Sequence, residues 1–497
     1  MKGTLFFTVR GNDKARKNAL IDKIKRVQQE YKELQKGTVN LDAFCDFKNK
    51  LDEIENDSFY KLLPTNFNRS IHHMREELEQ QFPIAAEPGD LPLVTIQHPS
   101  NDDLANMHGM FAGESEDQAT RIGHMTLKIH ESLDNLAPNL LCDTQQVSLA
   151  AYWLDLFAAI RQGNENLANR LLMAIPEEDQ ILNALIGIYK KQYLKQIIKH
   201  TIEAVDSARG TKRINNNDIV YTPGTFELII RDLATTLFCP TPICISFGLP
   251  THHATGSRAS GFCHLNKTAV LIDFLHKTSS EPLSFFIIGT DVNRDNGLCQ
   301  ILRTKQTEAP VCHIDIFDSR VYPQQNFNDI TMEFTQSPDI APNMALWKEG
   351  NYEYMAIDLQ SGRTNATELH PALLYSISTL KNQVEHAKTN QQKIMLLLPS
   401  GWDSHVHETA PCGKLLYGHT MMSDEETQLC RFSDQDLSTF YHEIFSIYLE
   451  NPEVFKGIYW GLEGGYNRAM YEQQISLLAE SIITHFYSQD LTPSLRR

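Results

Sequence analysis

The sequence predicts an α/β protein with a mostly parallel sheet, helices on both faces, and further helical regions in N-terminal and inserted segments. From about residue 220 onward, short runs rich in β-branched and aromatic residues alternate with longer amphipathic stretches, the pattern of repeated strand–helix units. Residues 125–208 have apolar residues at helical spacing almost throughout. With 41% hydrophobic and 22% charged residues, the chain has an ordinary globular composition.

The predicted strands are short apolar runs bounded by glycine, proline or polar residues. They lie at 243–247, 285–288, 311–317, 354–359, 394–398 and 457–462. Between them, 366–389 and 434–449 have the apolar spacing of amphipathic helices. Because strands buried on both faces appear as nearly continuous apolar runs, we expect a parallel sheet between two helical layers.

The N-terminal part of the chain has a different character. Residues 1–90 are highly charged, with apolar residues at helical spacing from Leu20 to Val27, and are predicted to form a charged helical arm. Residues 91–214 begin with a proline-rich stretch and continue as a helical block. This segment is predicted to be a linker followed either by a cap or by the start of the α/β domain. Residues 215–497 are predicted to form the α/β core.

Charge and cysteine content exclude several classes of protein. The 45 Lys+Arg and 62 Asp+Glu give a net charge of −17, which argues against direct binding to nucleic acid or an anionic membrane. The 9 cysteines are odd in number and irregularly spaced. They indicate a reducing, intracellular environment, cytoplasmic or nuclear, rather than a disulfide framework. No apolar run reaches the roughly 18 residues of a membrane span, so we expect none.

Polar side chains follow four of the predicted strands. They are His252 and His253, then Asp291 and Asn293, then Asp403, and finally Glu463 and Tyr466. A single polar residue after a strand is most often a helix cap or turn residue. Ligands of open α/β sheets bind outside the carboxyl ends of the strands. The coincidence of four such groups therefore favours a functional site at this edge.

The segments that carry these residues resemble the zinc-dependent histone deacetylase and acetylpolyamine amidohydrolase superfamily, which has an arginase-like α/β fold. HHATGSRASGFCHLN resembles the family segment of two histidines followed by Gly-Phe-Cys and Asn, and DVNRDNG is similar to Asp-x-His-His-Gly-Asn-Gly. SGWDSH looks like Gly-Phe-Asp-x-His, and LEGGYN matches the Gly-Gly-Tyr segment. The resemblance covers about 215–485.

The resemblance implies a role for each of these residues. Zinc would be bound at the positions of Asp291, Asn293 and Asp403, and a structural potassium ion is also implied. His253 would be the general base and acid, His252 would hold the water, and Tyr466 would hydrogen-bond the oxyanion. The residues implied to bind the acyl-lysine side chain are Gly261, Phe262, Tyr322 and Gly465.

The metal-ligand positions depart from the family pattern at Asn293, where the family has histidine. An amide oxygen is neutral and a weaker zinc ligand than imidazole, so weak zinc binding is expected. His405, two residues after Asp403, is a candidate substitute ligand.

The groups that orient the two histidines depart from the pattern as well. The carboxylate that would orient His252 aligns with Gly289, so this partner is missing. Asp315, where the family has a serine near its monovalent cation, is the candidate replacement. The partner of His253 aligns with Asn296.

Three functions remain open from the sequence. The first is a zinc-dependent deacylase acting on ε-acetyl-lysine of a histone-like protein or peptide. The second is a catalytically impaired relative that binds acyl-lysine or a protein partner, which the departure at Asn293 favours. The third is an acetylpolyamine amidohydrolase, since an acidic protein suits a cationic polyamine. A deacetylase-like core with an unmatched helical arm would suit a bacterial protein delivered into a host cell, and equally an enzyme with its own lid.

Overall fold

The structure is a computed structural model. It describes residues 20–29, 50–51, 54 and 93–487, the last range with gaps at 113–115, 134–140, 145–146, 215–217, 306–307, 324–334, 337–343, 363–367, 411–414 and 417–419. Most of the predicted arm at 1–90 lies outside these residues. Within it, residues 20–29 are helical, and Leu20 and Val27 are buried as the helical spacing predicts.

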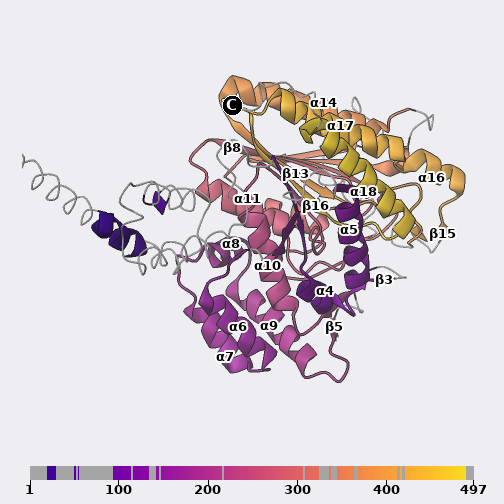
Figure 1. The fold of residues 1–497 in the computed structure, drawn as a ribbon. Coiled ribbons are helices and arrows are strands. Elements are labelled where there is room, and N and C mark those ends of the chain that lie inside the picture. Colours follow the sequence, from indigo (N-terminus) through magenta and orange to yellow (C-terminus); the bar gives the residue numbers. More distant parts are fainter. Residues whose placement is uncertain are drawn as a thin grey trace, which may run out of the picture.

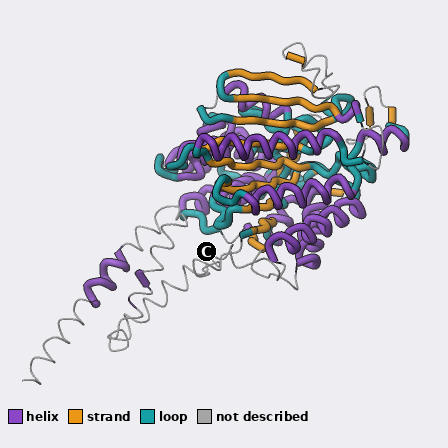
Figure 2. Tube along the Cα trace, turned by 90° about the horizontal axis from the view of Figure 1, so that it is seen from above, coloured by secondary structure: helices purple, strands orange, loops and turns teal. Residues whose placement is uncertain are grey.

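A ten-stranded sheet forms the centre of the molecule (Figures 1 and 2). Its strands, in spatial order, are β10 (Thr335–Gln336), β11 (Met344–Glu349), β12 (Tyr352–Asp358), β9 (Val311–Phe317), β8 (Leu283–Gly289), β13 (Lys393–Ser400), β16 (Phe455–Leu462), β7 (Ile243–Ser246), β1 (Val94–His98) and β4 (Leu141–Asp143). All neighbours from β12 to β4 pair in parallel, and β10 and β11 form an antiparallel edge. The predicted mostly parallel sheet is confirmed.

Helices cover both faces of this sheet, as Figure 1 shows. One group contains α5 (Gln118–Leu133), α14 (Pro371–Asn390), α17 (Asp434–Glu450) and α18 (Arg468–Ile482). The other contains α8 (Gln180–Ile188), α10 (Thr225–Leu237), α11 (Lys267–Thr278) and α12 (Asn296–Lys305). Helices α6 (Ala151–Arg161), α7 (Glu165–Ala174) and α9 (Lys191–Val205) pack beside the second group. Two short helices, α4 (Asn101–Met107) and α16 (Asp424–Cys430), complete the described set.

The strands form where the apolar runs are longest. All residues of β7 are buried, and in β13 only Lys393 is partly exposed. Burial on both faces explains why these strands lack polar alternation. Every predicted strand from 243 to 462 occurs in the sheet, with ends within about two residues.

Polar side chains cap the first turns of helices next to the sheet. The Asn266 side chain accepts a hydrogen bond from Ala269 N at the start of α11. Ser433 and Asp436 form a reciprocal capping box at the start of α17. These caps satisfy backbone donors that the first helical turn leaves open, so the helix directions next to the site are encoded locally.

The stretch predicted as a linker contains strand β1, which pairs with β7 and β4 inside the main sheet. Residues from 94 onward therefore contribute to the main sheet. In the described part of the chain, every helix is too short or too polar to cross a bilayer.

Candidate active site

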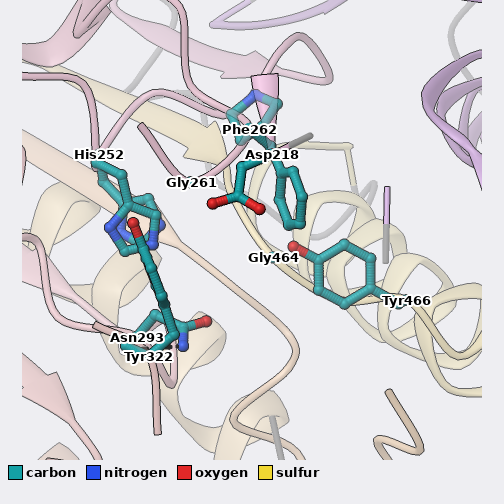
Figure 3. Close-up of a pocket in the computed structure, with 10 residues that line it drawn as sticks. Asp218, His252, Gly261, Phe262, Asn293, Tyr322, Gly464 and Tyr466 are labelled. Atoms are coloured by element: carbon teal, nitrogen blue, oxygen red, sulfur yellow. Dashed lines mark hydrogen bonds between the residues drawn. The ribbon is translucent and has the colours of Figure 1, made fainter. Parts of the chain in front are cut away.

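Four neighbouring strands position the site. In the sheet their order is β8, β13, β16 and β7, and the loops after their carboxyl ends contain the catalytic and metal-binding residues predicted from the sequence. The loops surround a pocket of about 140 Å³, lined by Asp218, Pro250, His252, His253, Gly261, Phe262, Asn293, Tyr322, Gly464 and Tyr466 (Figure 3). Gly464 rather than Gly465 lines the pocket, and Asp291 and Asp403 are almost fully buried.

The two histidine rings lie close together, tilted by 39° to each other, and have different electrostatic surroundings. Their ring centroids are 3.9 Å apart. Burial disfavours a charged His252, but Asp291, Glu463 and Asp295 outweigh it and raise the pKa of His252 to about 10. Burial and the neighbouring His252 hold the pKa of His253 well below its ordinary value. His253 is therefore the neutral ring of the pair.

The carboxylate of Glu463 anchors the loop that carries both histidines. This carboxylate accepts hydrogen bonds from Thr251 N and Thr251 Oγ1, both at 2.5 Å, and from His252 N at 3.2 Å. Thus the loop after β16 holds the loop after β7 in place.

Asn296 orients the His253 ring. Its Oδ1 lies 2.6 Å from His253 Nδ1, and since an amide oxygen only accepts, Nδ1 carries the proton. Nε2 is then the proton-accepting atom of His253. The predicted pairing of these two residues is confirmed.

Asp291 and Asp403 form the buried floor of the site. A Cβ placed on Gly464 would lie 2.0 Å from Asp403 Oδ2 and 2.7 Å from Asp291 Oδ2, so both oxygens converge beside this glycine. Asp403 Oδ2 is buried without a hydrogen-bond partner in the structure. Burial, followed by the charge of Asp291, raises the pKa of Asp403 well above its ordinary value. A divalent cation between the two carboxylates would offset both effects, so this donor set fits a metal.

Asn293 borders the same space. Its backbone N donates to Asp291 Oδ1 at 2.8 Å, and its Nδ2 donates to Tyr322 O at 2.8 Å. With Nδ2 directed at a backbone carbonyl, Oδ1 is the amide atom suited to a cation.

His405, the candidate substitute ligand, has polar neighbours near both ring nitrogens. Its Nε2 lies 3.1 Å from Asp434 Oδ1, and its Nδ1 accepts from His407 N at 3.1 Å. A role of His405 as a substitute for the missing histidine ligand stays a prediction.

The pocket wall requires unusual backbone at two positions. Gly261 and Phe262 have positive φ angles of 49° and 65°, and a Cβ on Gly261 would lie 2.4 Å from His253 Cδ2. Glycine at 261 thus permits close approach to the His253 ring. On the opposite side, the Tyr322 ring packs edge-on against His253 at 4.9 Å between centroids.

Tyr466 completes the pocket from the loop after β16. Its ring meets Phe262 edge-on at 6.4 Å between centroids, as Figure 3 shows. Its backbone N donates to Glu408 Oε2 at 2.6 Å. Behind the ring, Arg121 of α5 places its guanidinium carbon 4.9 Å from the ring centroid and donates from Nε to Gly465 O at 2.8 Å.

The carboxylate that orients His252 comes from an unexpected residue. Asp295 Oδ1 accepts from His252 Nδ1 at 2.8 Å. Asp315, the candidate replacement proposed from the sequence, instead accepts from Tyr354 OH at 2.6 Å and from Asp295 N at 3.1 Å. Two predictions are therefore wrong. His252 does have a carboxylate partner, and that partner is not Asp315.

The guanidinium group of Arg294 places a positive charge near Asp315. Arg294 donates from Nε to Tyr354 OH at 2.9 Å, and this hydroxyl donates to Asp315. Burial and the charge of Asp295 raise the pKa of Asp315 to about 7. The structural potassium ion stays a prediction.

Sequence reasoning missed Arg121, Asp218 and Asp295. Asp218 lines the pocket, and burial raises its pKa. Asp295 is part of DVNRDNG, where an acidic residue replaces the family glycine. That substitution was a visible signal, whereas Arg121 lies in a segment without a family motif.

Comparisons with known proteins identify one family model and similar solved structures. The family model described as histone deacetylase domain matches residues 183–482. Among solved structures, the chain is similar to the HD domain of HDA15, with a TM-score of 0.47 and 11% identity over 80% of this chain and 91% of that chain. It is also similar to an acetylpolyamine aminohydrolase from Burkholderia pseudomallei, with a TM-score of 0.48 and 11% identity over 78% of this chain and 98% of that chain.

A comparison with curated protein sequences found no match. The family model nevertheless spans most of the sheet, all four site loops and the helices between them. On this evidence, the chain belongs to the histone deacetylase domain family, whose members are hydrolytic deacetylases and amidohydrolases.

Proposed function

We propose that the protein is a zinc-dependent deacylase that hydrolyses the amide of ε-acetyl-lysine on a protein or peptide. One observation carries this proposal: the neutral His253 and Tyr466 line a single narrow pocket, next to two buried, converging carboxylates. A base, a hydrogen-bond donor and a metal-binding floor are the parts that metal-assisted amide hydrolysis requires.

Asp291, Asp403 and Asn293 would hold the zinc ion. When bound, the ion would polarise the amide carbonyl and lower the pKa of its water to about 7. This ligand set is all oxygen. Zinc sites usually include nitrogen or sulfur ligands, so we expect weaker zinc binding here than with a histidine at position 293.

The chain's own residues handle the protons. His253 Nε2 accepts a proton from the attacking water, because Asn296 keeps the other ring proton on Nδ1. The protonated ring then passes its proton to the leaving amine. Tyr466 donates a hydrogen bond to the oxyanion of the tetrahedral intermediate.

The pocket walls suit a lysine side chain. The rings of Phe262, Tyr322 and Tyr466 line the pocket, and this apolar surface matches a methylene stem. Asp218 adds a carboxylate to the lining, which suits a substrate with a donor or positive charge near the mouth. An acetylated polyamine shares that chemistry and is the second substrate class.

Metal analysis is the test of this function. Protein purified without chelator is analysed for zinc beside D403A, and both are assayed on an acetyl-lysine peptide and on acetylputrescine. We expect zinc and peptide hydrolysis in the wild type and loss of both in D403A.

Other outcomes separate the alternatives. Hydrolysis of acetylputrescine without the peptide would identify a polyamine amidohydrolase. Absence of zinc and of turnover, even with zinc supplied, would contradict the hydrolase and favour the acyl-lysine-binding relative that Asn293 suggests.

A further inference from the structure

We infer that Asp295 is the positioning residue of His252 and that Gly289 and Asp295 form an exchangeable pair sharing one carboxylate site. The inference rests on the proposed function, because it concerns a histidine of that catalytic site. It starts from the hydrogen bond of 2.8 Å between His252 Nδ1 and Asp295 Oδ1. Both side chains are almost fully buried, at 4% and 1% exposure, so water cannot replace the contact.

Gly289, at the end of β8, leaves the space that the Asp295 carboxylate fills. A Cβ placed on Gly289 would lie 2.4 Å from Asp295 Oδ2 and 3.0 Å from its Cγ. Real Cβ atoms essentially never lie this close to another heavy atom, so the Asp295 carboxylate would have to shift. A side chain at 289 and the carboxylate of 295 therefore exclude each other.

The two positions approach the same point from different backbones. Position 289 belongs to a sheet strand, and position 295 directly precedes helix α12. The family resemblance places an orienting carboxylate at 289, and here the carboxylate reaches His252 from 295. An aspartate at 289 with glycine at 295 would put the carboxylate back on the strand.

A second histidine holds Asp295 in place. His313 Nε2 donates to Asp295 Oδ2 at 3.1 Å. A neutral ring that donates from Nε2 accepts at Nδ1, where the Tyr352 hydroxyl lies 3.1 Å away. Both carboxylate oxygens are thus used, one by His252 and one by His313. Rotation of Asp295 would break both contacts, so the His252 ring has one favoured orientation.

This arrangement determines the orientation of the His252 ring. With Nδ1 donating to Asp295, Nε2 is directed toward Asp291, whose Oδ2 lies 3.9 Å away. Such supporting carboxylates of histidines typically contribute about 10–100-fold in activity or metal affinity.

The experiment compares wild type, D295G, G289D and the exchange variant G289D/D295G. On an acetyl-lysine peptide, we expect kcat of D295G to fall by about 10–100-fold with KM nearly unchanged. G289D alone should also lose activity, because two carboxylates then compete for one space. The exchange variant should recover most of kcat. Thermal unfolding and circular dichroism establish that each variant is folded.

A spectroscopic measurement separates this inference from the proposed function. The ring nitrogens of His252 are followed by NMR of protein labelled with ¹⁵N-histidine, with H252Q used for assignment. We expect the Nδ1 signal to shift in D295G and to return in the exchange variant. If wild type hydrolyses no substrate, the proposed function fails, and the ring signals alone decide the inference.

The inference is overturned if D295G retains the wild-type kcat and His252 signals, or if a folded exchange variant restores neither. G289A is a further probe, because its added methyl would meet Asp295, and it should lower kcat. Its matched control is G256A, where the nearest atom to an added Cβ is 3.8 Å away and no loss is expected.

Discussion

Arg121 and Gly465 are joined by a hydrogen bond of 2.8 Å from Arg121 Nε to Gly465 O, across 344 positions of the chain. Arg121 is 1% exposed and also donates to the carbonyl oxygen of Glu463. It lies on α5, which packs against α18 (Figure 1). Helix α5 therefore supports the loop that carries Tyr466.

R121A should impair both stability and activity. Loss of two charge-assisted buried hydrogen bonds is expected to lower the free energy of unfolding by about 3 kcal/mol, and kcat should fall as Tyr466 loses its support. Chemical unfolding and peptide hydrolysis measure the two effects. R468A is the matched control, since its ion pair with Glu472 is 53% and 31% exposed, and we expect a change below about 1 kcal/mol. Equal behaviour of the two variants would contradict the support assigned to Arg121.

N293H should raise zinc affinity. An imidazole binds zinc more strongly than a neutral amide, and we expect a gain of about tenfold or more, measured by competition with a chromogenic chelator. N293A serves as the comparison, with affinity below the wild type. Identical affinities for all three proteins would show that position 293 does not bind the metal.

Y466F should reduce kcat by about 10²–10³-fold with little change in KM, because the hydroxyl is expected to stabilise the transition state only. The ring contact with Phe262 is retained in this variant. Steady-state kinetics on an acetyl-lysine peptide measures the effect. The control is Y375F, whose hydroxyl lies 3.3 Å from Met355 Sδ and outside the pocket. A Y466F variant with wild-type kcat would remove Tyr466 from the mechanism.

Asp318 should contribute stability that depends on pH. Burial opposes its ionisation, but Arg431 and Arg320 outweigh burial and lower its pKa to about 2. The carboxyl is fully buried and lies 2.8 Å from Arg431. Since the folded pKa is below the unfolded value of 3.8, this stabilisation is complete above the unfolded pKa. It is lost as pH falls toward 2.

The pH effect is measured as the difference in unfolding free energy between wild type and D318N. We expect about 2 kcal/mol or more near pH 6, decreasing as the pH is lowered from about 5 toward 2. The control is E426Q, which removes the more exposed partner of Arg320. A difference that stays constant over this pH range would contradict the assignment.

The strands of the core could be predicted because burial on both faces leaves a local signature. In β13 all seven residues after Lys393 are buried, and the first five of them, Ile394 to Leu398, form a continuous apolar run. Strand β1 lies between Pro92 and Pro99, in a stretch whose proline content predicts a linker. Short edge strands such as β4 carry too few residues for a pattern.

The residue types of the site could also be predicted from the sequence. Each motif is a short segment with its own residue spacing, so it can be identified without knowledge of the fold. His252, His253 and Tyr466 were selected in this way, and the structure brings them to one pocket. The order β8, β13, β16, β7, which makes their loops neighbours, follows from long-range strand pairing.

The carboxylate partner of His252 and the support of the Tyr466 loop were decided by the tertiary structure alone. His252 and Asp295 are 43 positions apart, and Arg121 and Gly465 are 344 apart. Whether a carboxylate reaches His252 from 289 or from 295 depends on the space between a strand and a helix start, where Gly289 leaves room for Asp295. Local spacing encodes which chemical groups enter the site. Their orientation is a through-space property of packed elements, and it has no signature in any single segment.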